Sequence, residues 1–430
     1  MSRSIEVIGA VGLRVLTGGA HTIMNATTRT LSAAALVLGT ASGPAVAHAA
    51  TDATVPAVTA SASTALSKGA VPPVIATPPN AAALEKAIAG LGPGHADATA
   101  ALVRVAGTSG SWQGHSGVAD VRTGRPALEQ GRFRAGSVTK TFTAAVVLQL
   151  AAEGRVGLDR PVQEYLPGLL PGSFKPVTVR QLLNYTSGIR PADGPGDTFE
   201  DAFAHRFDRD DPRSLIANAV AKGPEFDPGT RQHYLNIDYT ILGLLIEKVT
   251  GRSYEQALTN RIFKPLGLRD TSLPSPTQTR IPGPHNRGYQ AVTRADGTRG
   301  LVDVTEWNSW SNWAAGDLIS TTADLERFTV ALFDGRLVPR AQLEEMFTVP
   351  EVKDFESGED AVQTAGLKRL VLPDGTVAYG KTGSRHGYST AIGGTRDLSR
   401  TLVYSVNSTD AKGLDMNKVA FDIVMAAFTR

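Results

Sequence analysis

From position 81 onward, the hydrophobic residues first have the spacing of a helix and then, in two segments, that of strands. The segment AAALEKAIAGL (81–91) has helical periodicity, and it stops where the Gly-Pro-Gly run at 92–94 breaks the pattern. Residues 100–105 and 114–120 have the character of strands, with a Gly- and Ser-rich turn between them. The pattern therefore predicts a helix and two strands joined by a turn.

The central part of the chain has a mainly helical pattern. A long helix is predicted over 137–153, and Gly154 ends it. Beyond Lys140 this segment is apolar on nearly every side (FTAAVVLQLAA), which is typical of a helix buried in the centre of a domain. Further helices are predicted over 239–249 and 322–334, among shorter helices and Pro- and Gly-rich loops.

The last part of the chain returns to strand patterns. Strands are predicted over 376–379, 388–393 and 400–406, and a polar turn around Asp397 joins the last two as a hairpin. A final helix is predicted over 417–429. Strands at both ends with helices between them predict an α/β (α+β) fold, with one antiparallel sheet built from both chain ends and flanked by helices.

The first residues have the features of a secretory signal over 1–49. Arg29 supplies the positive charge, the run LSAAALVL (31–38) supplies the apolar stretch, and Ala-His-Ala at 47–49 is a typical cleavage site. We expect the true start to be Met24 and the protein to be secreted and extracellular.

The remainder divides into a tether and one globular domain. Residues 50–80 are rich in Ala, Thr, Ser and Pro, a composition that cannot bury enough apolar surface to fold, so we expect a disordered tether. The domain is predicted to span 81–430, with a mostly helical insertion lobe at about 150–320.

Composition and charge exclude several classes of protein. The chain is 42% hydrophobic and 20% charged, which is ordinary for a globular protein. Its net charge of +2 resides in 1–49, and the neutral remainder argues against nucleic-acid binding. The lack of cysteine excludes disulfides and thiol nucleophiles. No apolar run reaches the ~18 residues of a membrane helix, so we expect no transmembrane anchor. Without HExxH or a dense His/Asp/Glu cluster, we expect no metal and no cofactor.

Candidate chemistry begins with the S-V-T-K segment at 137–140. Residues i and i+3 share a helix face, so Lys140 can place its amine beside the Ser137 hydroxyl. Serine needs a base to become a good nucleophile, and lysine serves when burial lowers its pKa. About one such motif is expected by chance in this chain, so for this motif alone an N-cap serine beside a solvated lysine is the more frequent interpretation.

Two more motifs carry groups that suit the same chemistry. In Y-L-N, Tyr234 supplies a phenol whose ionised form nearby cations would favour, and Asn236 can bind a substrate amide. In K-T-G, Lys381 supplies a second amine, and Gly383 permits another backbone to approach, so that an extended peptide could pair along this strand. These motifs occur by chance ~0.2 and ~0.1 times, so each alone also fits a structural loop or strand edge.

Together the three motifs occur by chance about 0.02 times. In this order they resemble the family of class C β-lactamases, serine D-alanyl-D-alanine carboxypeptidases, D-aminopeptidases and related esterases. The resemblance covers nearly all of 90–430, and the chain is most similar to the secreted actinobacterial D,D-carboxypeptidases. It is carried by FRAGSVTKTFTAAVVLQL, VTVRQLLNYTSGI, YLNIDYTILGLLIEKVTG, RIFKPLGL, AAGDLISTTADLERF and YGKTGSRHGYST.

The resemblance implies a serine hydrolase of β-lactamase/transpeptidase-like fold that is acylated on Ser137. It implies that Lys140 and Tyr234 share proton transfer with the help of Lys381, and that the backbone amides of Ser137 and Ser384 form the oxyanion hole. The residues implied to bind substrate are Asn236, Thr382, Gly383, Ser384 and Lys368, of which Thr382 and Ser384 would face a terminal carboxylate.

Three positions depart from the carboxypeptidase pattern. Lys381 stands where those enzymes have His, as it does in β-lactamases and many esterases. Lys368, next to Arg369, aligns with the Arg that holds the substrate's C-terminal carboxylate, and a lysine recognises a carboxylate less specifically. Tyr185 replaces the His that precedes T-S-G.

Two further features have open interpretations. His386 could touch substrate or tune deacylation, although an ordinary loop histidine is about three times more frequent in such a position. Trp307, Trp310 and Trp313 repeat every three residues and fit either a substrate cleft or core packing equally well.

The resemblance favours a monomeric D-alanyl-D-alanine carboxypeptidase that acts on peptidoglycan-type peptides and binds peptide or β-lactam substrates. A β-lactamase, a D-aminopeptidase and an esterase are alternatives that share the same acylation apparatus. From a different class come a non-catalytic penicillin-binding or sensor protein and a cell-wall binding module with a vestigial site.

Overall fold

The computed structural model describes residues 77–308, 312–413 and 415–428. The predicted signal and nearly all of the predicted tether lie outside these described residues. The first helix, α1 (Ala81–Ala87), begins at Asn80, whose side chain accepts a hydrogen bond from the Ala83 amide at 3.0 Å. This confirms the helix predicted at the start of the globular sequence.

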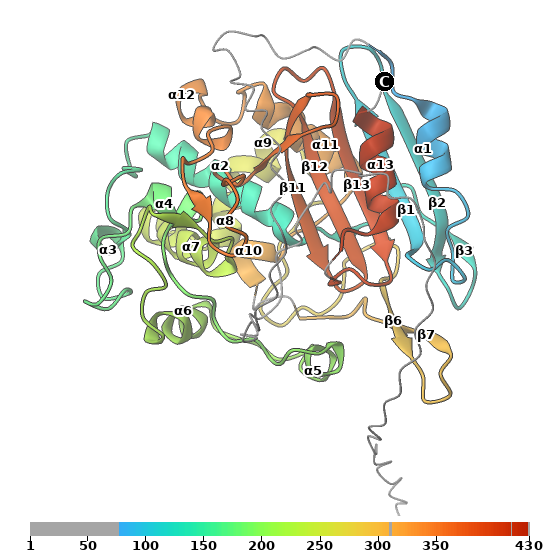
Figure 1. Ribbon diagram of the computed structural model, residues 1–430, viewed down its shortest axis with the longest axis horizontal. Coiled ribbons are helices and arrows are strands. Elements are labelled where there is room, and N and C mark those ends of the chain that lie inside the picture. Colours follow the sequence, from blue (N-terminus) through green and yellow to red (C-terminus); the bar gives the residue numbers. More distant parts are fainter. Residues whose placement is uncertain (1–76, 309–311, 414, 429–430) are drawn as a thin grey trace, which may run out of the picture. The chain divides into compact units, whose positions relative to one another are not determined.

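A seven-stranded antiparallel sheet is built from both ends of the described chain (Figure 1). Its central contact joins β1 to β13, so the N-terminal strands continue the C-terminal hairpin, as the fold-class prediction required. In sheet order the strands are β10 (Lys368–Val371), β11 (Val377–Arg385), β12 (Tyr388–Thr395), β13 (Thr401–Ser408), β1 (Ala98–Ala106), β2 (Trp112–Asp120) and β3 (Arg125–Pro126).

Alternation along the strands divides the core between the two faces of the sheet. Val103 and Val105 of β1 pack in a cluster with α1 and α13 (Lys418–Phe428), which lie side by side over one face (Figure 1). Leu102 points to the opposite face and joins the larger core that contains α2. The sheet is therefore covered by helices on both faces.

Helices dominate the chain between α2 (Thr139–Ala152) and β10. Helices continue beyond residue 320. One of them, α11, packs against β1, β12 and β13 of the sheet. Short paired strands interrupt them: β4 (Phe133–Arg134) with β8 (Ile319–Ser320), β5 (Arg231–Gln232) with β9 (Lys353–Asp354), and β6 (Tyr289–Thr293) with β7 (Arg299–Asp303). The helices are α3 (Val162–Tyr165), α4 (Val179–Leu183), α5 (Phe199–Ala204), α6 (Pro212–Ala221), α7 (Asn236–Thr250), α8 (Tyr254–Leu258), η2 (Thr259–Phe263), α9 (Lys264–Leu266), α10 (Trp313–Gly316), α11 (Thr322–Phe333), α12 (Arg340–Leu343) and η4 (Glu344–Met346).

The central helix begins later than its pattern predicts. Ser137 lies in a 3₁₀ turn, η1 (Gly136–Val138), and the α-helix proper starts at Thr139. Gly136 has φ +53°, which does not continue a right-handed helix. The Thr139 hydroxyl donates to the Gly136 carbonyl at 2.7 Å and accepts from the Leu318 amide at 3.0 Å, which holds this turn.

Candidate active site

The turn that carries Ser137 is pressed against strands β11 and β12. The Thr390 hydroxyl donates to the Ala135 carbonyl at 2.8 Å. A Cβ added at Gly136 would lie 2.6 Å from the Ser384 nitrogen, and one added at Gly383 would lie 1.9 Å from the Ala135 oxygen. Both contacts are shorter than real Cβ atoms tolerate, so glycine at both positions allows the nucleophile turn to touch the strand. The backbone that approaches Gly383 is that of Ala135, and pairing of a peptide along this strand stays a prediction.

Lys140 is buried and makes three polar contacts through its amine. Nζ lies 3.1 Å from Ser137 Oγ, 2.7 Å from Asn236 Oδ1 and 2.8 Å from the Ala315 carbonyl oxygen. Burial lowers the pKa of Lys140 well below its ordinary value, and the positive charges of Lys381 and Lys412 act in the same direction.

Three contacts fit an ammonium with three donors, and they also fit the neutral amine that burial favours. An uncharged lysine has two N–H donors and one lone pair. The Asn236 side-chain oxygen and the Ala315 carbonyl can only accept, so they take both donors. The lone pair is then left for the hydroxyl proton of Ser137, which is the geometry that a general base requires.

Tyr234 joins the two lysines from separate parts of the chain. The Nζ atoms of Lys140 and Lys381 lie 5.0 Å and 4.5 Å from the centroid of its ring. The expectation that these cations would favour a phenolate is wrong: burial raises the pKa of the Tyr234 phenol, and the effect of Ser137 opposes this only in part. The two amines face the ring of Tyr234, and both are themselves shifted toward neutrality.

Lys381 is buried on β11, and its amine donates to the Thr382 carbonyl at 3.1 Å. Burial lowers the pKa of Lys381 to about 7, and the charge of Lys368 adds to this shift. Lys368 lies on β10, opposite Gly380 in the β10–β11 register, and burial lowers its pKa as well. The charge of Lys368 thus reaches Lys381, although the register places the two side chains on opposite faces of the sheet.

The outer edge of β11 is open at the nucleophile. β10 pairs with β11 only over Val377–Gly380, so the residues from Lys381 onward have no strand neighbour on that side. Arg385 and Tyr388 close a hairpin with a two-residue loop, and such a closing pair is hydrogen-bonded. Because hydrogen-bonded pairs alternate along an antiparallel ladder, the backbone N–H and C=O of Ser384 point to the open edge.

This orientation makes the Ser384 amide available beside Ser137. An amide pair from Ser384 and Ser137 would have the form of an oxyanion hole, as the resemblance implied. The side chain of Ser384 differs from the expectation, because its hydroxyl donates to the Ala411 carbonyl instead of facing the open edge. Thr382, on the same strand, is half-buried.

Two residues at the site carried no usable pattern in the sequence. Lys412, in the connection between β13 and α13, donates to the Ser384 carbonyl at 3.2 Å. Asp238 is fully buried in the first turn of α7, where it accepts a hydrogen bond from the Ser187 hydroxyl at 2.6 Å. Burial raises the pKa of Asp238 to about 8. The nearest signals in the sequence were the segments Y-L-N-I-D, which contains Tyr234 and Asn236, and T-S-G, which contains Ser187.

Aromatic rings surround the site on two sides. Tyr185, with φ +63°, packs its ring 4.8 Å from that of Tyr234, so it takes part in the core beneath the phenol. His386 is stacked on Trp307 with ring centroids 4.5 Å apart and meets Phe199 edge-on at 5.4 Å. Burial lowers the pKa of His386 to about 3, so the ring is neutral.

The tryptophan repeat divides between the two interpretations. Trp307 lies against His386 near the end of β11, whereas Trp313 is part of the main core and packs on Tyr254 with ring centroids 5.2 Å apart. Trp310 lies outside the described residues. Within the described ranges, no helix is long and apolar enough to cross a membrane, and no group of three or more His, Asp or Glu side chains could hold a metal ion.

Comparisons with known proteins identify the family of the chain. A family model described as Beta-lactamase matches residues 81–424. The solved structure of a D-stereospecific amidohydrolase from Streptomyces sp. is 35% identical, with a TM-score of 0.69, and the match covers 82% of this chain and 99% of that one.

Curated relatives are similar over shorter regions. Penicillin-binding protein 4* of Bacillus subtilis (strain 168) is 28% identical over 298 residues, which are 68% of this chain and 64% of that protein. Protein flp of Staphylococcus aureus (strain MW2) is 32% identical over 219 residues, and the match spans only 41% of its length.

Proposed function

Because the chain belongs to the beta-lactamase family of serine hydrolases, we propose that it is a D-alanyl-D-alanine carboxypeptidase acting through an acyl-enzyme on Ser137. The observation that carries this proposal is the basic end of β10 and β11 beyond the nucleophile, where Lys368 acts electrostatically on Lys381. The proposal includes export of the protein, which rests on the sequence of residues 1–49 alone.

Substrate direction follows from strand pairing. A peptide bound antiparallel to β11 exchanges both backbone hydrogen bonds with Ser384 through one residue, the one that supplies the scissile carbonyl. Its following residue, the leaving group, then lies toward Lys381 and Lys368, because the peptide runs opposite to β11. A free C-terminal carboxylate on that leaving residue would be attracted by the basic groups at this end of the strand.

Acylation would proceed with the groups already described. Ser137 Oγ attacks the carbonyl carbon while its proton passes to the lone pair of Lys140 Nζ. The negative charge that develops on the carbonyl oxygen is stabilised by the amides of Ser137 and Ser384, each worth roughly 3–4 kcal/mol of barrier. The C–N bond breaks as the leaving amine takes a proton from the Tyr234 phenol, which Lys140 can then reprotonate. Attack of water on the ester returns free Ser137.

A second candidate function is hydrolysis of D-amino acid amides. The similarity to the Streptomyces D-stereospecific amidohydrolase over nearly the whole of that chain favours it. The two functions use the same acylation groups and differ in the leaving group, which is a D-amino acid with a carboxylate in one case and ammonia in the other.

The test compares leaving groups on one acyl group. N-acetyl-D-alanyl-D-alanine and N-acetyl-D-alaninamide are incubated with the enzyme, and release of D-alanine or ammonia is measured. We expect a higher kcat/KM for the dipeptide, and no turnover of either by Ser137→Ala. Labelling with a fluorescent penicillin followed by mass spectrometry should place the adduct on Ser137. Turnover of the amide alone would refute the carboxypeptidase and support the amidase, and no turnover of these two substrates or of D-alaninamide, with no adduct, would refute both.

A further inference from the structure

Lys412 is hydrogen-bonded to a backbone oxygen that a bound substrate also uses. Its amine donates to the Ser384 carbonyl at 3.2 Å, and that carbonyl points to the open edge of β11. In an antiparallel pairing, the nitrogen of the acyl residue must donate to this same oxygen while the scissile carbonyl accepts from the Ser384 amide. Because a carbonyl oxygen has two lone pairs, the substrate nitrogen either shares it with the Lys412 amine or replaces that amine, and in both cases it lies directly beside Lys412.

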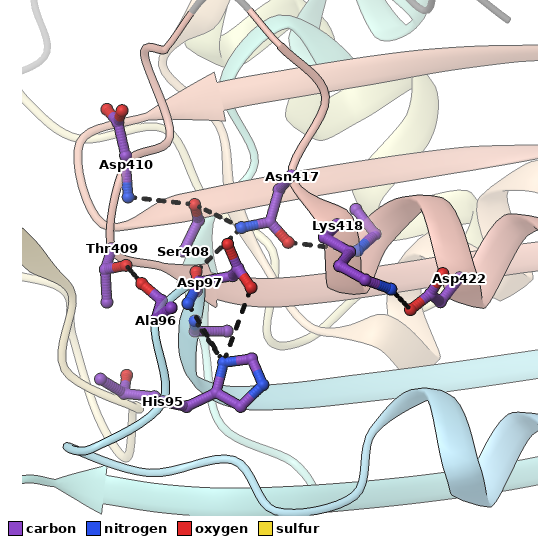
Figure 2. A network of polar contacts seen from close by, with 12 residues as sticks. His95, Ala96, Asp97, Ser408, Thr409, Asp410, Asn417, Lys418 and Asp422 are labelled. Carbon is purple, nitrogen blue, oxygen red and sulfur yellow. Dashed lines mark hydrogen bonds and ion pairs between the residues drawn. The ribbon is translucent and has the colours of Figure 1, made fainter. Parts of the chain in front are cut away.

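The connection that carries Lys412 is fixed at both ends (Figure 2). At its start, the Thr409 hydroxyl donates to the Ala96 carbonyl at 2.6 Å and the Thr409 amide donates to Asp97 at 3.0 Å. At its end, the Asn417 side chain donates to the Asp97 carbonyl at 2.8 Å and to Ser408 Oγ at 3.0 Å. Lys412 can therefore turn aside from Ser384, but the backbone holds its amine near the open edge.

The charges around this position are positive. Burial lowers the pKa of Lys412 to about 7, and the charge of the buried Arg385, the residue after Ser384, adds to this shift. The charge of Lys412 in turn acts on both Lys140 and His386. The acyl side of the site therefore holds an amine, charged below about pH 7, where the nitrogen of the acyl residue binds, and this amine is separate from the lysines on the leaving-group side.

We propose that Lys412 determines acyl specificity by accepting an acyl residue whose nitrogen is acylated and rejecting one with a free α-ammonium. An amide N–H donates to Ser384 without carrying charge, whereas an ammonium placed beside the lysine is repelled. This inference deepens the proposed function, because peptidoglycan-type donors are acylated at this nitrogen and D-amino acid amides are not. The side chain thus separates the two candidate substrate classes.

The test uses two substrates that differ only at that nitrogen, N-acetyl-D-alaninamide and D-alaninamide. The wild-type enzyme should prefer the acetylated amide in kcat/KM by about tenfold or more. Lys412→Met should remove most of this preference by raising kcat/KM for D-alaninamide. Lys412→Arg should keep the preference, and Lys412→Gln, which stays neutral but can still donate to Ser384, should behave like Lys412→Met if the methionine variant does not fold.

Lys418→Met is the matched control, because Lys418 is exposed at the start of α13 and pairs with Asp422 at 2.6 Å (Figure 2). It should leave the substrate ratio unchanged. An equal loss on both substrates in both neutral Lys412 variants, or a wild-type preference for the free ammonium, would overturn the inference. Failure of the carboxypeptidase proposal is a separate result, since it appears as lack of D-alanine release from the dipeptide while the ratio between the two amides is still measured.

Discussion

Gly136→Ala isolates the contact that brings the nucleophile to the sheet. Gly136 has φ +53°, and an added Cβ would lie 2.6 Å from the Ser384 nitrogen and 3.0 Å from the Ser384 oxygen. Neither neighbour is the end of a flexible side chain, since both are backbone atoms of β11. The substitution must therefore move η1, β11 or both.

The expected magnitude follows from these distances. The left-handed backbone costs an alanine about 1 kcal/mol, and the overpacked contact adds about 1–3 kcal/mol. Ordinary contact begins at 3.4 Å, so Ser137 and the Ser384 amide must separate by about 0.8 Å. A misplacement near 1 Å costs about 100-fold in rate, so acylation should slow by about that factor.

Gly154→Ala is the matched control at the other end of the same helix. Gly154 has φ +70°, but nothing lies within 4 Å of an added Cβ. It should lose about 1 kcal/mol of unfolding free energy with an unchanged acylation rate. Both variants are assayed by stopped-flow acylation with a fluorescent penicillin and by chemical denaturation. An acylation rate for Gly136→Ala within threefold of Gly154→Ala would refute the inferred contact.

Three further predictions address individual side chains. Lys140→Ala should slow acylation by about 10²–10⁴-fold, and near-normal acylation of that variant would exclude Lys140 as the base. Asp238 has a folded pKa of about 8 against an ordinary 3.8, so the folded state binds the extra proton between these values and the unfolding free energy falls as pH rises across this range. Asp238→Asn keeps the acceptor for Ser187 and should flatten that decline, which unfolding midpoints at pH 5 and pH 8 would measure; an unchanged slope would contradict it. Lys368→Met should lower kcat/KM for N-acetyl-D-alanyl-D-alanine by about tenfold relative to the amide, and an equal effect on both would argue against carboxylate binding.

The strands and helices that were predictable are those whose burial follows a simple period. The final helix and the hairpin of β12 and β13 have clear patterns, and a sheet built from both termini follows from their order. The start of the central helix was mispredicted because a 3₁₀ turn and an α-helix have similar local patterns. The turn at Ser137 is fixed by Leu318, far away in the sequence.

Contacts in the candidate site were predictable only between residues that are close together in the sequence. Ser137 and Lys140 are three residues apart on one turn, and their contact follows from helix geometry. Lys412 reaches Ser384 across 28 positions, and Asp238 meets Ser187 across 51. No period links such pairs, so only the folded chain reveals them.

The roles of the phenol and the amine follow from which effect dominates their pKa values. Nearby cations would favour a phenolate, but burial opposes charge on every group of the pocket and prevails at Tyr234. The same burial moves Lys140 toward a neutral amine, whose two donors are already taken by Asn236 and Ala315. We therefore infer that Lys140 takes the first proton and that Tyr234, which starts protonated, supplies the leaving amine.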